Sequence, residues 1–573
     1  MGLRILFGLF AISLVSASIS FGQSPGPEDS SPWFREEAAE RGLKFLHVSG
    51  HDGQFLFPEI HAGGAALFDA DQDGDLDAYL VQAGSLVVAP DQDPGNQLFL
   101  NRGNGQFRKA RPKNGADDRG YGMGVAAGDF DNDGRTDLYV TNVGPNVLLR
   151  NLGNGRFEDV TSKAGVGVGG WSASAIFFDY DLDGDLDLFV TNYLNWTVEL
   201  EVECFDKAGR LNYCGPAKYD TPAADFLFRN EGGSRFFDAT AEARMDVAFG
   251  TGLGVGTGDF DNNGWPDLFV ANDGMLDQLW LNQGDGTFRD EAVYRGCAAD
   301  LSGQPKAGMG VTVADVDNDG DLDLAVCNLG GETDSVFLNE GDYFTDYTGA
   351  SGLAAISRSL TRFSMAWVDF DNDGILDIYE TAGAITTHGR IYLESDPYAE
   401  PNLLMRGLPG PQYREVLPRG GTRELLVATS RAAAFGDVDG DGGMDILVLN
   451  RDAPAYLLIN QAPNRGNWLR VVARNAHGSP ALSASVVVTV GGRMIRREAH
   501  STFSYQAAND PAAHFGLGKV EAIDALVVRW PDGWRRCLGP QKTNQTLEIE
   551  RSDGAECPTE MGSPDKAGNQ SRR

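Results

Sequence analysis

A nine-residue segment rich in aspartate occurs seven times in this chain, and it has the composition of a cation-binding loop. Its clearest copy is Asp69-Ala70-Asp71-Gln72-Asp73-Gly74-Asp75-Leu76-Asp77. Calcium is a hard cation that binds about six to eight oxygen atoms, and alternating acidic side chains on a sharp turn supply them. We therefore predict a calcium site in each copy, up to seven Ca²⁺ in all.

The predicted ligands are the side chains at positions 1, 3, 5 and 9 of each copy, and we number the copies loop 1 to loop 7 in chain order. These ligands are Asp69, Asp71, Asp73 and Asp77; Asp129, Asp131, Asp133 and Asp137; Asp179, Asp181, Asp183 and Asp187; Asp259, Asp261, Asn263 and Asp267; Asp315, Asp317, Asp319 and Asp323; Asp369, Asp371, Asp373 and Asp377; and Asp437, Asp439, Asp441 and Asp445. Position 6 is always glycine, which indicates a positive φ angle. Position 7 varies freely, as expected of a ligand supplied by the backbone carbonyl.

Two alternatives to this interpretation can be weighed. The loops are not EF-hands, because no glutamate stands at position 12 and the flanking residues are strand-like. Acidic turns that serve only solubility are the other alternative. Seven copies in register speak against it, and so does the repulsion among about four carboxylates in one turn that holds no cation.

The overall charge of the chain excludes some classes of partner. The sequence has 82 acidic and 47 basic residues, a formal net charge of −35. Nucleic-acid binding requires basic patches, so we predict no nucleic-acid partner. The same charge speaks against an anionic membrane surface. Because the loops account for much of the acidity, the total charge identifies no partner.

The N-terminus has the pattern of a secretory signal peptide over residues 1–17. Arg4 precedes an apolar run from Ile5 to Val15, which is too short to span a bilayer. Residues 18–32 are predicted to be a flexible leader. No later apolar stretch approaches 18 residues, so we predict no other transmembrane segment. An uncleaved anchor is the alternative, and either way the chain is predicted to be secreted, periplasmic or at the cell surface.

Six cysteines agree with an oxidising compartment. Cys204 and Cys214 lie in one insertion and are the best candidates for a disulfide. Proximity in the sequence also suggests pairs between Cys297 and Cys327 and between Cys537 and Cys557, although six cysteines allow about 15 full pairings. No cysteine or histidine has zinc spacing.

The segments that flank the loops predict an all-β fold. Each repeat reads as four short strands, with one strand entering the loop and one leaving it. The loops begin 60, 50, 80, 56, 54 and 68 residues apart, a period typical of β-propeller blades. Loop 7 is followed by too few strands, and the segment that begins at Trp33 resembles the missing one. We therefore predict a seven-bladed propeller over residues 33–462, closed by this strand, rather than an open array.

Other segments lie outside this repeat pattern. The insertions Tyr193–Thr221 and Gly383–Pro401 are predicted to carry binding or to be surface embellishments. From residue 466 the pattern changes to that of a small β-domain, predicted to end at 551. Residues 552–573 are polar and predicted to be disordered.

Both halves of the chain resemble known families. The loops with their Phe-x-Asp, Leu-x-Asn and Gly-x-Phe flanks resemble FG-GAP/VCBS repeats, the family that includes the integrin α-chain propeller. The C-terminal segment resembles the ASPIC/UnbV domain through Asn467-Trp468-Leu469, His514-Phe515-Gly516-Leu517-Gly518 and Val528-Arg529-Trp530-Pro531-Asp532-Gly533. It departs from that pattern at Asn475-Ala476-His477-Gly478-Ser479-Pro480. Together the halves resemble the cartilage acidic protein family, which implies secretion and bound calcium but no defined activity.

Enzyme motifs do not explain the sequence. Gly-x-Ser-x-Gly, a phosphate-binding Gly-x-x-x-x-Gly-Lys and His-Glu-x-x-His are absent. His47, His51 and His61 lie close together in the sequence. They could form a transition-metal site or be ordinary polar residues of loops. We predict a secreted calcium-binding module for an extracellular protein or glycan. The alternatives are a hydrolase or lyase with its site in the propeller channel, and a structural matrix or envelope component.

Overall fold

The computed structural model describes residues 31–87, 94–233, 235–387, 390–551 and 557. Its regular structure is almost entirely β. The α-helices of the described residues are single turns, α1 (Thr161–Ala164), α2 (Ala292–Arg295), α3 (Thr348–Ser351) and α4 (Leu353–Ser357). The predicted all-β class is therefore confirmed.

Seven antiparallel sheets follow one another along the chain, and we call them blades 1 to 7. Each blade has four main strands, with the loop of the same number between its first two. They are β2 (Ala65–Phe68), β3 (Asp77–Leu80), β4 (Gln97–Leu100) and β5 (Arg108–Lys109); β6 (Tyr121–Gly128), β7 (Asp137–Val143), β8 (Val147–Asn151) and β9 (Phe157–Asp159); β10 (Ser172–Phe178), β11 (Asp187–Asn192), β14 (Phe226–Asn230) and β15 (Phe236–Asp238); β16 (Gly252–Gly258), β17 (Asp267–Asn272), β18 (Gln278–Asn282) and β19 (Phe288–Asp290); β20 (Val311–Ala314), β21 (Asp323–Val326), β22 (Ser335–Asn339) and β23 (Phe344–Asp346); β24 (Arg362–Val368), β25 (Asp377–Ala382), β27 (Leu403–Leu408) and β28 (Gln412–Glu415); and β29 (Val427–Gly436), β30 (Asp445–Arg451), β31 (Tyr456–Asn460) and β1 (Phe34–Glu36).

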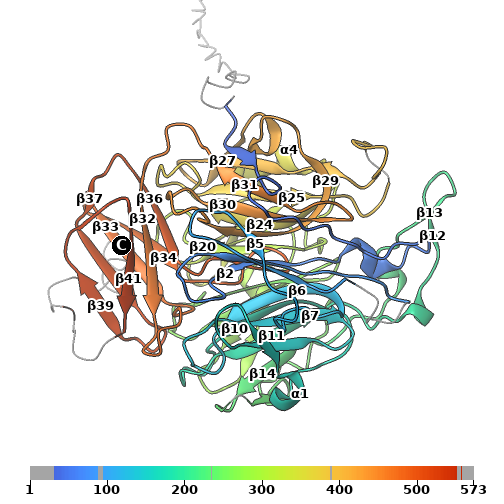
Figure 1. Cartoon of the computed structure of the whole chain (residues 1–573), viewed down its shortest axis with the longest axis horizontal. Coiled ribbons are helices and arrows are strands. Elements are labelled where there is room, and N and C mark those ends of the chain that lie inside the picture. The colour runs from blue at the N-terminus through green and yellow to red at the C-terminus, as the bar shows by residue number, and fades with distance from the viewer. Residues whose placement is uncertain (1–30, 88–93, 234, 388–389, 552–556, 558–573) are drawn as a thin grey trace, which may run out of the picture.

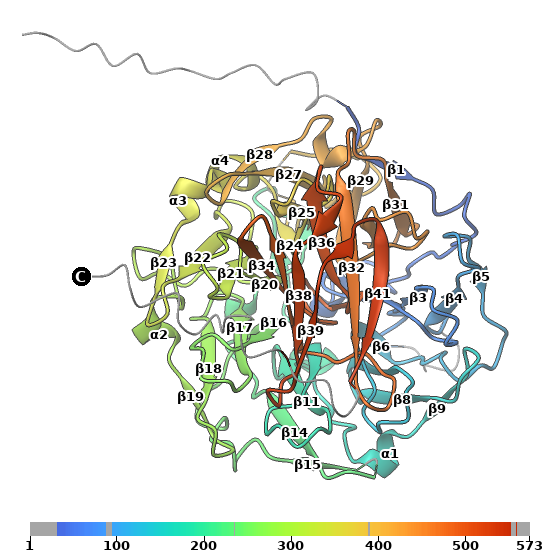
Figure 2. The ribbon, with the colours of Figure 1, turned by 90° about the vertical axis from the view of Figure 1, so that its left-hand side faces the viewer.

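The blades form a closed ring. The first strand of each blade contacts the first strand of the next, and β29 contacts β2, so the series returns to its beginning. The outer strands lie around the rim (Figure 2). The predicted closing strand is confirmed, because β1 pairs with β31 and places Phe34 opposite Asn460. Closure removes the open sheet edges that a linear array would expose.

Small residues let the inner strands approach one another closely. A Cβ atom on Gly124 would lie 2.6 Å from the carbonyl oxygen of Ala173 in the next blade. On Gly254 it would lie 2.0 Å from the carbonyl oxygen of Met309. The side chains of β6, β10 and β16 are all buried. The centre of the ring therefore excludes larger residues at these positions.

Residues 467–550, which we call the C-terminal domain, form two further main sheets. One contains β32 (Asn467–Arg474), β36 (Ala513–Gly518) and β41 (Gln545–Glu550), and the other contains β33 (Ser485–Val490), β34 (Arg493–Glu498), β38 (Ala525–Arg529) and β39 (Arg535–Leu538). Phe515 and Trp530 lie in a separate hydrophobic core between these sheets. The domain covers one end of the ring (Figures 1 and 2).

A segment of the C-terminal domain, residues 501–510, enters the ring, and we call it the central segment. Its strand β35 (Ala507–Ala508) pairs in parallel with β2 of blade 1. Ser504 exchanges two backbone hydrogen bonds with Val311 of blade 5, and Asp510 N donates to Phe435 O of blade 7 at 3.0 Å. Tyr505 is completely buried. The chain's own residues therefore fill the middle of the propeller.

Two of the three suggested disulfides are present. Cys204 and Cys214 join β12 (Cys204–Phe205) to the segment after β13 (Leu211–Asn212), and Cys537 is joined to Cys557. The prediction of a disulfide between Cys297 and Cys327 was wrong, because both thiols are free and buried. They pack in different hydrophobic clusters, so sequence proximity misled the prediction.

Several sequence predictions lie beyond these residues. The signal peptide (1–17), most of the leader (18–32) and the C-terminal tail (552–573), apart from Cys557, are outside the described part of the chain. Among the described residues, no helix has the length and apolar character needed to cross a membrane.

Candidate metal centres

The seven aspartate loops share one backbone conformation. Each connects the first strand of its blade to the second. The glycine at position 6 has φ between 82° (Gly442) and 103° (Gly320), as predicted. Position 4 is also left-handed in every loop, including Leu182, which has φ of 58°. Two left-handed residues fold the loop back on itself, so that its acidic side chains point inward.

Backbone N–H groups hold the carboxylates in place. In loop 2, Asp129 Oδ2 accepts from Gly134 N at 2.9 Å, and Asp133 Oδ1 accepts from Arg135 N at 3.1 Å. Asp137 at position 9 accepts from Phe130 N at 3.2 Å through Oδ2. Its Oδ1 accepts from the backbone N–H of Asn151, the last residue of β8, at 2.6 Å. The position-9 contacts recur in all seven loops.

The predicted ligands at positions 1, 3 and 9 converge. In each of loops 1 to 5, one oxygen from each of these three residues lies within 4.8 Å of the other two. The position-5 side chains are not part of these groups, and they bond to the backbone at position 7 instead. Loops 6 and 7 keep the same backbone contacts and close charge pairs.

Several carboxylate oxygens in these clusters are buried and have no hydrogen-bond partner in the described structure. They are Oδ1 of Asp71, Asp131, Asp181, Asp315 and Asp439. A buried charged oxygen without a partner is costly, so it indicates a missing positive group. Three oxygens around one point, all hard donors, fit a divalent cation such as calcium.

The electrostatics of the loops agree with this fit. Burial raises the pKa of Asp77 and of Asp323 to about 8, opposed by their backbone N–H contacts and increased by neighbouring aspartates. Burial likewise raises the pKa of Asp179 to about 7. Metal-free loops would therefore hold protons near neutral pH, and a bound cation would displace them.

Arginines supply part of the missing charge in some loops. Arg150 of blade 2 pairs with Asp131 at 2.5 Å and with Asp133 at 2.9 Å. Arg406 occupies the equivalent strand of blade 6 and pairs with Asp371 at 2.8 Å. Both guanidinium groups contact the carboxylates at positions 3 and 5 of their loops. The affinities of the seven loops for a cation are therefore expected to differ.

A set of asparagines links the loops, a role that was not predicted from the sequence. In six blades, an asparagine that ends the third strand, or directly follows it in blade 1, donates through Nδ2 to the position-2 carbonyl oxygen in the loop of the preceding blade. The pairs are Asn101 to Val438, Asn151 to Ala70, Asn230 to Phe130, Asn282 to Tyr180, Asn339 to Phe260 and Asn460 to Phe370. The repeated Leu-x-Asn pattern was the available signal. Blade 6 has Gly407 instead, and a Cβ there would lie 2.3 Å from Leu376 O.

The three N-terminal histidines have different surroundings. His51 Nδ1 lies 2.6 Å from Glu59 Oε2, and His47 Nδ1 accepts from Asp452 N at 3.3 Å. His61 is buried among aromatic rings, and burial together with the charge of Arg431 holds its pKa well below the usual value. The positive charge of Arg431 beside His61 would repel a bound metal ion. The interpretation of these histidines as a transition-metal site therefore gains no support.

Family models match both parts of the chain. Residues 69–140, 129–190 and 259–326 match an FG-GAP-like repeat, and residues 474–556 match ASPIC and UnbV. The chain thus contains FG-GAP-like repeats and a C-terminal ASPIC/UnbV domain. It is similar to cartilage acidic protein 1 of Mus musculus, with 27% identity over 515 residues that cover 85% of this chain and 73% of the mouse protein. The Homo sapiens protein is 28% identical over 521 residues, with 85% and 71% coverage.

Solved structures give only weak likenesses. One is an Agrocybe aegerita lectin that recognises non-reducing terminal N-acetylglucosamine, with 17% identity, a TM-score of 0.38, and coverage of 64% of this chain and 87% of the lectin. Another is YCF48 bound to D1 peptide, with 8% identity, a TM-score of 0.39, and coverage of 76% and 99%. At these TM-scores neither carries an argument about function.

Proposed function

We propose that this FG-GAP repeat protein is a secreted calcium-binding propeller that acts as a binding or adhesion module for an extracellular protein or glycan. The observation that carries the proposal is the buried, unpartnered carboxylate oxygen that recurs in loops 1, 2, 3, 5 and 7. Positions 1, 3 and 9 would supply the ligands, joined by position 5 and the position-7 carbonyl. The ion would neutralise the aspartates and stiffen each blade.

Calcium binding would contribute a large part of the stability. Extracellular sites bind at about 10⁻⁴–10⁻³ M, so about 1 mM Ca²⁺ would stabilise the fold by roughly 0.4–1.4 kcal/mol at each site. Seven sites would give roughly 3–10 kcal/mol, which is comparable to the net stability of a domain. The proposal therefore predicts a strong dependence on the free calcium concentration.

The test is thermal unfolding combined with a calcium count. We expect EGTA to lower Tm sharply and calorimetry to give up to seven ions per chain. Magnesium at equal concentration is the control, because Mg²⁺ demands a stricter octahedral geometry. A melting curve that EGTA leaves unchanged would contradict the calcium assignment.

Secretion is supported by the signal-like N-terminal pattern and by two disulfides. A direct test is expression of the full chain with its N-terminal segment, followed by N-terminal sequencing of exported protein. Cleavage after residue 17 is expected. A full-length chain retained in the cytoplasm would contradict the assignment.

A surface for the partner is suggested at the end opposite the C-terminal domain, where β12 and β13 project (Figure 1). The two insertions meet there, because Asn212 Nδ2 donates to Thr387 Oγ1 at 3.0 Å and Tyr398 OH donates to Asn212 Oδ1 at 2.9 Å. Phe205 on the hairpin is 55% exposed. Nearby Leu200, Val202, Leu211, Ile391 and Leu393 are also exposed. Clustered exposed apolar side chains mark interaction sites.

This partner surface can be tested with a binding screen of calcium-loaded protein against glycans and surface proteins. Phe205→Asp is expected to abolish the interaction found. Leu301→Asp is the control, because Leu301 is 85% exposed and lies outside both insertions. Equal loss in both variants would place the binding surface elsewhere.

The alternative enzyme hypothesis placed a hydrolase or lyase site in the propeller channel. Tyr505 and Gln506 of the central segment are buried there, so the channel offers no open site at this position. The named relatives are cartilage acidic proteins rather than enzymes. A structural role in a matrix or envelope remains testable by the solubility of the expressed chain.

A further inference from the structure

The C-terminal domain lies directly on loops 5 and 6. Arg496 Nη1 donates to Gly320 O of loop 5 at 2.8 Å. On loop 6, His514 Nε2 lies 2.8 Å from Asn372 Oδ1, and Gly518 N donates to Asn372 O at 2.8 Å. The loops that carry the candidate metal ligands are therefore also the docking surface for the domain.

One carboxylate of loop 5 is enclosed by this interface. Asp315 is 3% exposed, and its Oδ1 has no partner among the described residues. It lines a cavity of about 90 Å³ together with Asp369 and Arg497. Asp315, Asp317 and Asp323 present oxygens within 4.8 Å of one another. A cation held by these three residues would supply the contact that Asp315 lacks.

The charges at the interface show why such an ion would matter for docking. Loop 5 carries five aspartates, including Asp321 at position 7. The domain brings Arg496 and Arg497 to it, but Arg496 also pairs with Glu498 at 2.5 Å. Docking therefore brings the carboxylates of Asp315, Asp369 and Glu498 to a cavity lined by Arg496 and Arg497, and this excess of negative charge costs free energy. A divalent ion removes two of these charges, so ion binding and docking favour each other reciprocally.

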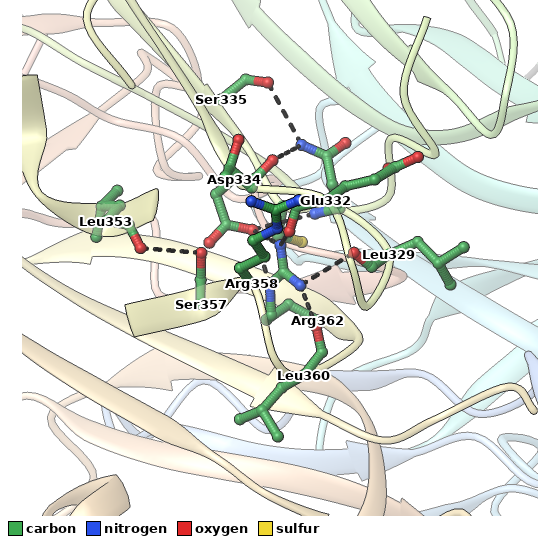
Figure 3. A network of polar contacts seen from close by, with 12 residues as sticks. Leu329, Glu332, Asp334, Ser335, Leu353, Ser357, Arg358, Leu360 and Arg362 are labelled. Carbon is green, nitrogen blue, oxygen red and sulfur yellow. Dashed lines mark hydrogen bonds and ion pairs between the residues drawn. The ribbon is translucent and has the colours of Figure 1, made fainter. Parts of the chain in front are cut away.

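The contact between loop 5 and the C-terminal domain lies at the boundary between blades 5 and 6, where a link found between other blades is missing. Because Gly407 replaces the asparagine of the other blades, the loop 5 carbonyl of Val316 has no link of that kind. Deeper in this boundary, Arg362 and Asp334 form a fully buried ion pair at 2.6 Å (Figure 3). Ser504 of the central segment pairs with Val311 on β20, the strand that runs directly into loop 5. The central segment therefore contacts the strand that enters loop 5, just as it contacts β2, the strand that enters loop 1.

We propose that the cation of loop 5 locks the C-terminal domain and its central segment onto the propeller. This inference rests on the proposed metal binding and adds a role for one site. Loop 1 has no such interface with β34, since no described hydrogen bond joins residues 69–77 to that strand, although Ala507 and Ala508 of the central segment pair with β2, the strand that enters loop 1. The ion of loop 1 would therefore stabilise blade 1 without acting on β34.

The test compares Asp319→Ala in loop 5 with Asp73→Ala in loop 1, in the full chain at saturating calcium. Both residues occupy position 5, both are exposed, and each accepts from the position-7 N–H, at 2.9 Å and 3.1 Å respectively. Neither has a described contact with the C-terminal domain. Asp319→Asn keeps an acceptor for the Asp321 N–H, so this variant separates loss of the ion from a shift of the loop backbone at Gly320. Bound calcium is counted by mass spectrometry, and hydrogen exchange is followed over β34, residues 493–498, which carries Arg496.

Each variant is expected to lose about one ion. Only Asp319→Ala is expected to speed exchange over residues 493–498, by about two- to tenfold, the range that one extracellular-type site supports. Asp319→Asn provides a milder variant should Asp319→Ala fold poorly. Equal exchange in both variants after loss of one ion each would overturn the lock while leaving calcium binding intact. A wild-type chain without bound calcium would overturn both proposals.

Discussion

The side-chain amide of Asn151 donates a hydrogen bond of 3.1 Å to the carbonyl oxygen of Ala70, 81 residues earlier in the chain. The contact joins the third strand of blade 2 to the metal loop of blade 1. Asn101 makes the equivalent contact with Val438 of loop 7, across the point where the ring closes. The loops are thus tied to their neighbours before any ion is considered.

Asn151→Ala tests the strength of this link. Asn151 is fully buried, and its Nδ2 also donates to Thr136 O at 2.9 Å. Truncation leaves two carbonyl oxygens without their donor, so we expect a loss of about 2–6 kcal/mol in unfolding free energy, at roughly 1–3 kcal/mol for each unpaired group. Urea unfolding at fixed calcium measures it. Arg156→Ala on the exposed turn is the control, and equal values for the two variants would contradict the role of the link.

The buried pair of Arg362 and Asp334 has a third member in Glu380 (Figure 3 shows the first two). Glu380 is fully buried, and burial followed by the charge of Asp334 raises its pKa well above the usual value. In Asp334→Asn, we expect Glu380 to ionise in place of the lost carboxylate. The unfolding free energy of Asp334→Asn should therefore fall by less than the roughly 3–5 kcal/mol expected when a buried ion pair is broken.

The double variant Asp334→Asn/Glu380→Gln should show the full loss, because Arg362 then has neither acid. Urea unfolding of the wild type, both single variants and the double variant completes the cycle. Strict additivity of the two single variants would show that Glu380 does not take over the charge.

The stability is expected to depend on pH through Glu400. Glu400 is 8% exposed, burial raises its pKa to about 7, and its Oε2 accepts from Thr361 N at 2.8 Å. The folded state then keeps a proton that the unfolded state releases above about pH 4.5. Its contribution is therefore present at low pH and is lost as the pH rises toward 7.

Glu400→Gln keeps the acceptor for Thr361 and removes the titration. Between pH 5 and 8, its unfolding free energy should fall by up to about 3 kcal/mol less than that of the wild type, the equivalent of roughly two units of pKa. The measurement is urea unfolding at both pH values in saturating calcium, which suppresses titration of the loops. Parallel pH profiles for the two proteins would disprove the assignment.

Tyr505→Ala tests the central segment. Tyr505 is completely buried, and its ring packs edge-on against Phe363 with centroids 5.1 Å apart. Removing it leaves a large cavity, so we expect a loss of about 3–5 kcal/mol. Met494→Ala in the same domain is the control, because Met494 is 46% exposed. If the two variants melt at the same temperature, the segment does not support the ring.

The repeated pattern predicted most of the propeller, because each local signal agrees with the others. The glycine at position 6 and the alternating aspartates specify the loop geometry whatever the surroundings. The closing strand at Phe34 could be recognised since it resembles strands elsewhere in the chain. The loop ligands at positions 1, 3 and 9 converge for the same reason.

Contacts between distant segments could not be predicted in this way. Ser504 meets Val311 and Arg496 meets Gly320, and no repeated pattern in the C-terminal domain reports either pair. The Leu-x-Asn pattern was visible, but the carbonyl that each asparagine binds belongs to a different blade. Cys297 and Cys327 are near in sequence, yet a blade boundary separates them.

The central segment has a consequence for the order of events during synthesis. Ala507 and Ala508 pair with Ala65 and Ala66, which leave the ribosome more than 400 residues earlier. The central segment is thus synthesised after all seven blades. A truncated product that ends at blade 7 does not contain it. Contacts so distant in sequence form slowly. In a nascent chain, the centre of the propeller would lack the central segment until about the final tenth of the polypeptide has emerged. Until then, chaperones and proteases would have access to the inner strands of the blades.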